Sequence, residues 1–158
     1  MYAKEALAKT GVRPAIILGV LSEESDLGTN LGSGSWRTDM NPTRDAPLFQ
    51  QICAEFGYNP DNQPVSKKPW SGWRGAMGPA QFIPSTWVQC ARSMGSGHGN
   101  LRRRDAYGRQ RRRSAERLAA LRYLAGWKNA KKSAYSYYGD AVVNLAEQFQ
   151  QQINVLGG

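Results

Sequence analysis

The sequence is poor in the side chains that build disulfide frameworks and metal centres. Only two cysteines, Cys53 and Cys90, and one histidine, His98, occur in 158 residues. Two cysteines are too few for a disulfide scaffold or a zinc site. Both lie in apolar helical patterns, so we expect buried thiols, while a single disulfide between them stays open. His98 lies among glycines with no second metal ligand or nucleophile nearby, so we expect a loop residue and no metal or other cofactor.

Long apolar runs are also missing. The longest uncharged apolar run, residues 15–21, is far shorter than the roughly 20 residues that span a bilayer, which excludes a membrane-spanning helix. The first five residues lack the basic and apolar regions of a signal peptide, so either the protein stays in the cytoplasm or its export signal has been removed. Glycine (17) and proline (8) are too infrequent for collagen or a wholly disordered chain. We expect one domain, residues 1–158.

Acidic residues are scarce in one part of the chain. The net charge is +9, from 21 Lys and Arg against 12 Asp and Glu. Residues 92–132 hold thirteen of the basic residues but only two acids, Asp105 and Glu116. A basic segment on a nearly neutral domain predicts a polyanionic partner, which is nucleic acid, acidic lipid or an anionic cell-wall polymer.

Helical periods dominate the rest of the sequence. Apolar residues recur at helical spacing in segments 13–25, 47–56, 85–94 and 114–124, and Ser85 and Asp140 are placed to cap helices that follow them. Residues 58–84 are rich in Pro, Gly and Trp without a regular period, which is typical of a long functional loop. Because no alternating strand pattern occurs, we expect a mainly α fold with long irregular loops.

One carboxylate falls on the apolar face of the first predicted helix. At about 100° per residue, Glu24 aligns with Ile17, whereas Glu23 is turned toward the edge of that face. A buried glutamate is costly unless it is protonated or partnered. Desolvation also raises the pKa of a carboxyl, as a general acid near neutral pH requires. If the helix ends earlier, Glu24 is simply solvated.

Two motifs resemble those of the lytic transglycosylases that cleave bacterial peptidoglycan. The first is ESDLG at residues 24–28, and the second, which is long and specific, is GAMGPAQFIPSTW at residues 75–87. Residues 122–126 (RYLAG) and 138–146 are similar to later signatures of the family. The resemblance covers about residues 2–90 and 114–156, and it implies a lysozyme-like, mostly helical domain with a long saccharide cleft.

The resemblance assigns the chemistry to Glu24 alone. This side chain would protonate the glycosidic oxygen between MurNAc and GlcNAc. It would then deprotonate the C6 hydroxyl of MurNAc, which closes on C1 to form a 1,6-anhydro product. Glycosidases ordinarily need two carboxylates. Here the substrate supplies its own nucleophile, so one carboxyl that starts protonated is sufficient.

The resemblance also implies substrate contacts around the catalytic acid. Gln81 would hydrogen-bond the sugar, Met77 would lie under the ring, and Ser25 would hold the turn beside the glutamate. Tyr123 would place its phenol against the glutamate and the cleft floor, with Tyr138 in support. For both tyrosines ordinary helix packing is the alternative.

Loop tryptophans are the remaining sugar-binding candidates. Trp36, Trp70 and Trp73 lie in Gly- and Pro-rich segments rather than in helical stripes. They are therefore plausible platforms for pyranose rings, and Trp73 is the strongest of them, although loop tryptophans also fill the cores of small domains. Trp87 and Trp127 are expected in the core or at its rim.

Two features depart from the family pattern. Leu124 stands where the third signature often carries Asn, so any polar role of that Asn is absent. Residues 95–113 are dominated by arginine, which cannot line an apolar interface. We therefore expect a basic, solvated and mobile loop there.

Three functions remain open at this point. The resemblance favours a peptidoglycan lytic transglycosylase of the periplasm or cell exterior, acting as a monomer on glycan strands. A lysozyme-like muramidase, in which water placed opposite Glu24 gives hydrolysis, or an inactive wall-binding domain would use the same fold. An arginine-rich nucleic-acid-binding module at residues 102–117 would explain the basic segment, but neither Glu24 nor the motif at 75–87.

Overall fold

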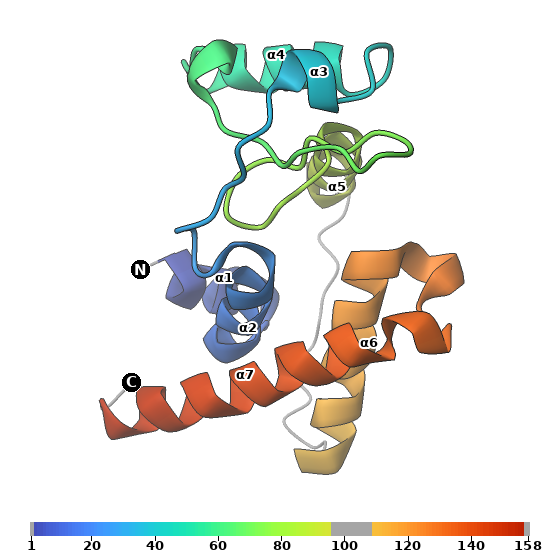
Figure 1. Cartoon of the computed structure of the whole chain (residues 1–158). Helices are drawn as coiled ribbons and strands as arrows, with labels where there is room; N and C mark the ends of the chain where they lie inside the picture. Colours follow the sequence, from blue (N-terminus) through green and yellow to red (C-terminus); the bar gives the residue numbers. More distant parts are fainter. Residues whose placement is uncertain (1, 96–108, 157–158) are drawn as a thin grey trace. The chain divides into compact units, whose positions relative to one another are not determined.

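The computed structural model describes residues 2–95 and 109–156 as helices joined by irregular loops (Figure 1). Within these residues there are seven α-helices and two short 3₁₀ helices, and the β pairing consists of isolated bridges. The prediction of a mainly α fold is thus confirmed. The chain divides into two compact units, Met1–Glu23 with Asn100–Gly158, and Glu24–Gly99. Whether they make one domain, as we expect from the sequence, stays a prediction.

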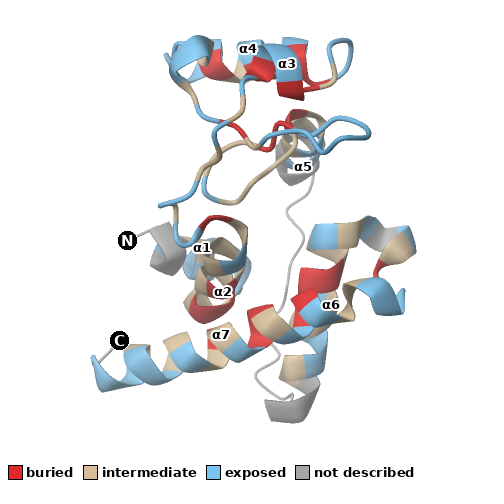
Figure 2. Cartoon of the chain, in the orientation of Figure 1, coloured by how far each residue is buried: buried red, intermediate tan, exposed pale blue. Residues whose placement is uncertain are grey.

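The first unit is built from long helices around one apolar core. Its elements are α1 (Tyr2–Thr10), most of α2 (Pro14–Ser25), α6 (Arg109–Asn129), η2 (Ser133–Tyr135) and α7 (Ser136–Val155). Figure 2 shows buried residues on α2, α6 and α7. The core residues from these three helices are Ala15, Ile16, Ala120, Tyr138, Val142, Val143 and Ala146.

Gly19 explains how closely α2 approaches α7. A Cβ atom at this position would lie 2.6 Å from the backbone oxygen of Val142, closer than real Cβ atoms come. Glycine within a helix costs about 1 kcal/mol relative to alanine. This cost is offset because the two helix backbones can touch, which fixes the helix that carries Glu24 at its end.

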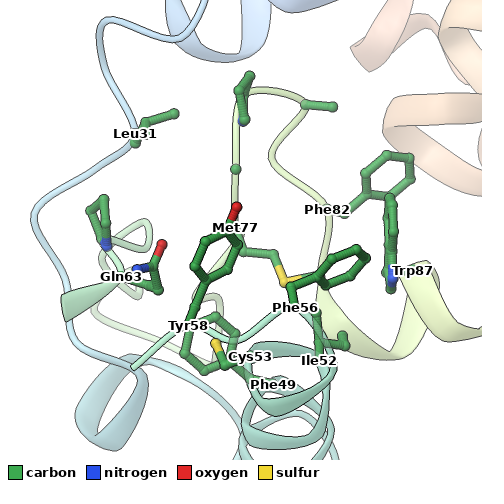
Figure 3. Close-up of a pocket in the computed structure, with 14 residues that line it drawn as sticks. Leu31, Phe49, Ile52, Cys53, Phe56, Tyr58, Gln63, Met77, Phe82 and Trp87 are labelled. Carbon is green, nitrogen blue, oxygen red and sulfur yellow. The ribbon is translucent and has the colours of Figure 1, made fainter. Parts of the chain in front are cut away.

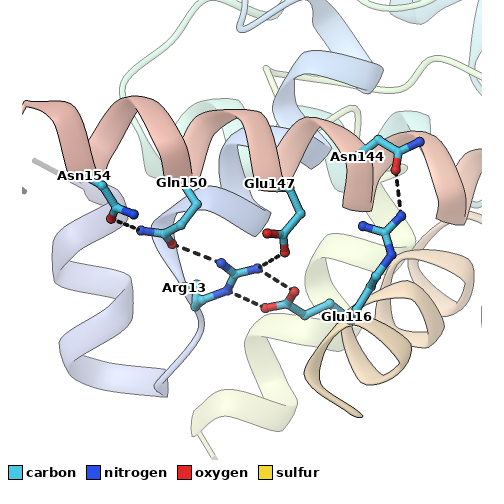
Figure 4. Close-up of polar contacts among 7 residues, drawn as sticks. Arg13, Glu116, Asn144, Glu147, Gln150 and Asn154 are labelled. Atoms are coloured by element: carbon cyan, nitrogen blue, oxygen red, sulfur yellow. Dashed lines mark hydrogen bonds and ion pairs between the residues drawn. The ribbon is translucent and has the colours of Figure 1, made fainter. Parts of the chain in front are cut away.

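A nearly buried ion pair joins the start of α2 to α6 and α7 (Figure 4). Arg13 donates Nε and Nη2 to the two carboxylate oxygens of Glu116, both at 2.7 Å, and the two side chains are only 16% and 14% exposed. Its Nη1 donates to Gln150 at 3.0 Å, and Glu147 lies 3.5 Å from Nη2. The hydrogen bonds to Glu116 raise the pKa of Arg13, so this guanidinium stays charged.

Part of the basic segment is helical, which corrects our expectation of a loop through residue 113. Helix α6 begins at Arg109, and Arg113 donates to Asn144 on α7 at 2.7 Å. Helix α7 begins at Ser136, so Asp140 does not cap it. Asp140 instead pairs with Arg117, with Nε and Oδ1 2.6 Å apart. Arginine is a good helix former, and its long side chain reaches polar partners on a neighbouring helix. Residues 96–108, with His98, lie outside the described part.

The second unit packs short helices against irregular loops. Its elements are α3 (Trp36–Asp39), α4 (Ala46–Glu55), η1 (Pro60–Asn62) and α5 (Pro84–Gly95). The core residues are Trp36, Met40, Ala46, Phe49, Cys53 and Val65. The hypothesis that Trp36 is a sugar platform is therefore wrong. Its side chain is 8% exposed, and its indole N–H donates to Asp61 at 2.8 Å, because α3 turns the ring into the core.

Asp45 connects α4 with α5 inside this unit. Its fully buried carboxylate accepts hydrogen bonds from the Ser85 backbone N–H at 3.1 Å and from the Arg44 guanidinium at 2.7 Å. Burial alone would raise the pKa of Asp45, but the bonds from Arg44 and Ser85 outweigh burial and lower it. Ser85 was expected to cap α5; the helix begins one residue earlier, and Ser85 lies in its first turn.

The two cysteines lie in different surroundings. Cys53 is buried in the core of the second unit, where burial raises the pKa of its thiol, whereas Cys90 is exposed. The two cysteines form no disulfide with each other in the structure. The expectation of a buried thiol is confirmed for Cys53 and wrong for Cys90. None of the described helices combines the length and apolarity needed to cross a bilayer.

Candidate active site

Helix α2 ends with the two glutamates that the sequence singles out. Glu23 is exposed, Glu24 is half-buried, and Ser25 is only 2% exposed. The helix continues past Glu24, so the alternative of an earlier helix end is wrong, and Glu24 is less exposed than Glu23, as the helical phase predicts.

A strained turn follows Glu24 directly. Asp26 and Leu27 have φ values of 49° and 57°, and Gly28 continues the left-handed stretch at 92°. Such conformations are costly for a bulky side chain such as leucine and concentrate at functional sites. The Gly28 N–H donates to Ser25 Oγ at 2.9 Å, and the Asn30 N–H donates to the Ser25 carbonyl at 2.9 Å. The buried serine therefore stabilises the turn beside the glutamate.

Ser25 also joins the two motifs that carry the resemblance. Its hydroxyl donates a 2.6 Å hydrogen bond to the backbone carbonyl of Pro79, 54 residues further along the chain. Both residues belong to the second unit. The glutamate that precedes Ser25 is thus held beside the loop of the second motif.

The second motif folds back on itself as a tight loop. Met77 and Phe82 exchange backbone hydrogen bonds of 2.9 and 3.1 Å. Within this loop Gln81 has a positive φ of 50°, and both its backbone N–H and its side-chain Nε2 donate to the Gly78 carbonyl, at 3.0 and 2.9 Å. The Gln81 side chain is therefore fixed on the loop.

The motif loop also lines an apolar pocket of about 290 Å³ within the second unit (Figure 3). Met77 lines it among aromatic side chains, and Trp87 and Phe82 pack edge to face with ring centres 5.6 Å apart. Trp87 is half-buried and is not among the core residues of the second unit, so it lies at the rim of that core, as expected. The described residues that line the pocket do not include Glu24 or Gln81; they are Leu31, Phe49, Ile52, Cys53, Phe56, Tyr58, Gln63, Pro64, Met77, Gly78, Pro79, Ala80, Phe82 and Trp87.

The predicted site residues are distributed over both units. Trp73 belongs to the second unit, together with Glu24, Ser25 and the motif loop, and is 46% exposed. Tyr123 and Tyr138 belong to the first unit. Tyr138 is 5% exposed in its core, and Tyr123 packs against that core half-buried. Helix packing is thus shown for both tyrosines, and their contact with the glutamate stays a prediction.

Sequence reasoning missed several groups of the site. The Pro79 carbonyl accepts from Ser25, and the Asp39 carboxylate accepts from the Lys68 N–H. Both contacts join distant segments, for which no local signal exists. Phe82 stands within the second motif and Tyr58 directly follows the predicted helix 47–56, so their positions in the sequence were a usable signal. Within the described residues, no three Asp, Glu, His or Cys side chains lie close enough together to hold a metal ion.

Comparison with known families gives one match. Residues 2–109 match the family model described as Transglycosylase SLT domain, a range that includes α1 to α5 and both motifs. The match runs through residues 95–109, which we expected to depart from the family, whereas residues 122–126 and 138–146 lie beyond it. The comparisons with curated proteins and with solved structures find no significant match.

Proposed function

The chain belongs to the Transglycosylase SLT domain family, and on that premise we propose that Glu24 alone cleaves the MurNAc-β-1,4-GlcNAc bond of peptidoglycan. Family membership makes the protein a peptidoglycan lytic transglycosylase with a lysozyme-like helical fold. The proposal adds the catalytic residue, the glycosidic bond that is cleaved and the product that forms. The observation that carries it is the Ser25–Pro79 hydrogen bond, because it holds the glutamate beside the loop of the second motif.

Glu24 first acts as the acid. Its carboxyl proton passes to the glycosidic oxygen, the bond from that oxygen to C1 of MurNAc breaks, and GlcNAc leaves with a new hydroxyl. This role needs a carboxyl that carries its proton when the sugar binds, and Glu24 is half-buried at the end of helix α2.

Glu24 then acts as the base. The carboxylate takes the proton from the C6 hydroxyl of MurNAc, and O6 forms the new bond to C1. The product is 1,6-anhydroMurNAc, and the carboxyl has regained its proton. No water is consumed, so a second carboxylate to activate one is not needed.

The neighbouring side chains would hold the sugar. The Gln81 side-chain carbonyl is the atom that we assign to the sugar N–H and hydroxyl groups, because Nε2 already donates to Gly78. Met77 offers an apolar surface for the ring face, and Trp73 a partly exposed indole. We assign Tyr123 and Tyr138 to the support of the glutamate. We place this activity in the cell envelope, where peptidoglycan lies, and expect a monomer.

A matched pair of variants tests the assignment. Glu24→Gln should lose peptidoglycan cleavage by a factor of about 10² to 10⁴, the contribution of a positioned acid, with an unchanged or slightly higher Tm. Glu23→Gln, one residue earlier and exposed, should cleave at the rate of the parent protein. The assay is the release of soluble fragments from purified peptidoglycan. An active Glu24→Gln protein beside an inactive Glu23→Gln protein would refute both the helical phase and the catalytic assignment.

A further inference from the structure

A short loop, residues 66–76, leads into the second motif and is closed at its base. The Ser66 N–H donates to the Ala76 carbonyl at 2.9 Å, and the Ala76 N–H donates back to Ser66 Oγ at 2.9 Å. Between these two residues the chain forms no helix or strand, and residues 67–74 are exposed. These two hydrogen bonds hold only the ends of the loop. The conformation of the residues between them depends on further contacts.

Asp39, at the end of α3, supplies a second clamp. Its Oδ1 accepts the Lys68 N–H at 2.8 Å, and its backbone carbonyl accepts the Arg74 N–H at 2.9 Å, so one residue holds both sides of the loop. Its Oδ2 accepts from the Ser35 N–H and the Thr38 hydroxyl, both at 2.8 Å. Asp39 is only 8% exposed, so these bonds are shielded from water.

The clamped loop presents a bare indole at its tip. Trp70 is 99% exposed, and no other large apolar side chain of the described residues is exposed as much. The same loop carries Lys67, Lys68 and Arg74 and contains no acidic residue. The Lys68 ammonium lies 4.6 Å from the ring centre of Trp73 and covers one of its faces, so Trp73 has one face left for a sugar, whereas Trp70 is exposed almost completely.

We propose that this loop is an outer glycan-binding platform, in which Trp70 stacks on the apolar face of a pyranose ring of the peptidoglycan strand. The identity of this ligand rests on the proposed function. The basic side chains would pair with the carboxylates of the peptide stems that the strand carries. A loop that is already fixed before binding loses less conformational entropy when Trp70 stacks on a sugar. The contacts of Asp39 therefore contribute to binding as well as to stability.

The composition of the loop favours a glycan over a lipid surface. Pro69, Ser71 and Gly72 next to Trp70 add little apolar area, whereas membrane-surface segments insert an extended apolar face. The loop also continues directly into the motif that Ser25 holds beside Glu24, all within one unit. One unit therefore carries both the catalytic loop and Trp70, and a single glycan strand is expected to contact both.

Binding to purified insoluble peptidoglycan by co-sedimentation tests the platform, in the Glu24→Gln protein so that the ligand stays intact. Trp70→Ala should raise the apparent Kd about tenfold, and Trp70→Tyr, which keeps an aromatic face, should stay within about threefold of the parent. Tyr137→Ala is the matched control, because Tyr137 is also exposed (66%) but lies on α7 in the other unit.

The outcomes distinguish the glycan-binding platform from a lipid anchor and from the catalytic proposal. Unchanged binding by Trp70→Ala, or an equal loss in Tyr137→Ala, would overturn it. So would a Trp70→Ala protein that loses binding only to vesicles of phosphatidylglycerol and phosphatidylcholine, which would make the loop a lipid anchor. Cleavage retained by Glu24→Gln would refute the catalytic proposal alone, because the platform is measured by binding and not by turnover.

Discussion

Asp39→Asn is the sharpest test of the clamp that holds the loop of Trp70. An aspartate accepts hydrogen bonds through both oxygens, and an asparagine of the same shape turns one of them into an amide that only donates. That amide must face either the Lys68 N–H or the Ser35 N–H and Thr38 hydroxyl. In each case at least one backbone donor loses its acceptor.

The size of the effect follows from these contacts. Hydrogen bonds to a charged group contribute about 1.5–3 kcal/mol each, and a buried donor left unpaired costs about 1–3 kcal/mol. Because the asparagine would keep part of these hydrogen bonds but lose the charge and at least one acceptor, we expect a loss of about 2–3 kcal/mol in the free energy of unfolding. For a chain of this length that corresponds to a fall in Tm of about 4–12 °C.

The pH dependence gives the assay an internal control. The Lys68 N–H, followed by the Ser35 and Thr38 donors, lowers the pKa of Asp39. A carboxyl with a lowered pKa stabilises the fold above its ordinary value of about 4 and loses that contribution as the pH falls further. Thermal unfolding should therefore separate parent and Asp39→Asn most at neutral pH, and the gap should narrow toward about pH 3.

The matched control is Asp140→Asn, which removes the charge of an aspartate that is 53% exposed and pairs with Arg117. Its Tm should change only slightly, because exposed ion pairs are screened by water and salt. A fall in Tm as large as that of Asp39→Asn would refute the reasoning. A gap between parent and Asp39→Asn that does not change with pH would refute it equally.

Three further predictions concern packing and charge. Glu116→Gln leaves Arg13 with weaker partners and should lower the unfolding free energy by about 2–3 kcal/mol in urea titrations; a loss below about 1 kcal/mol would contradict the burial of the pair. Gly19→Ala should cost about 1–3 kcal/mol in the same assay, because the new methyl group meets the α7 backbone, and a neutral effect would rule out that close approach. Changing the arginines at 102–104 to Ser should weaken binding to peptidoglycan at low salt but not at 1 M salt, where the Debye length is about 3 Å; a loss independent of salt would exclude long-range attraction.

Local patterns in the sequence were sufficient for the helices that lead to the site. The predicted segment 13–25 corresponds to α2 (Pro14–Ser25), and 47–56 and 85–94 correspond to α4 and α5 within one residue at each end. Helical periodicity also separated Glu24 from Glu23, because the orientation of a side chain on a regular helix depends on spacing alone.

Contacts between distant segments were beyond such patterns. Trp36 stands in a loop-like sequence, yet its indole N–H finds Asp61 and its ring enters the core. The sequence around Asp140 predicts a helix cap, but in the structure its carboxylate pairs with Arg117. Helix α1 was missed because its sequence is polar on average and Leu7 is its single large aliphatic side chain. The clamp of Asp39 likewise depends on a partner 29 residues away.

The mass of the products tests the central claim most directly. Purified peptidoglycan digested by the protein should yield fragments that end in 1,6-anhydroMurNAc, lighter by one water molecule than the fragments that a muramidase releases from the same material. This result requires the C6 hydroxyl of the substrate to be the nucleophile, with Glu24 as its only base. Fragments that end in ordinary reducing MurNAc would contradict the account, because they show that water attacked C1 instead.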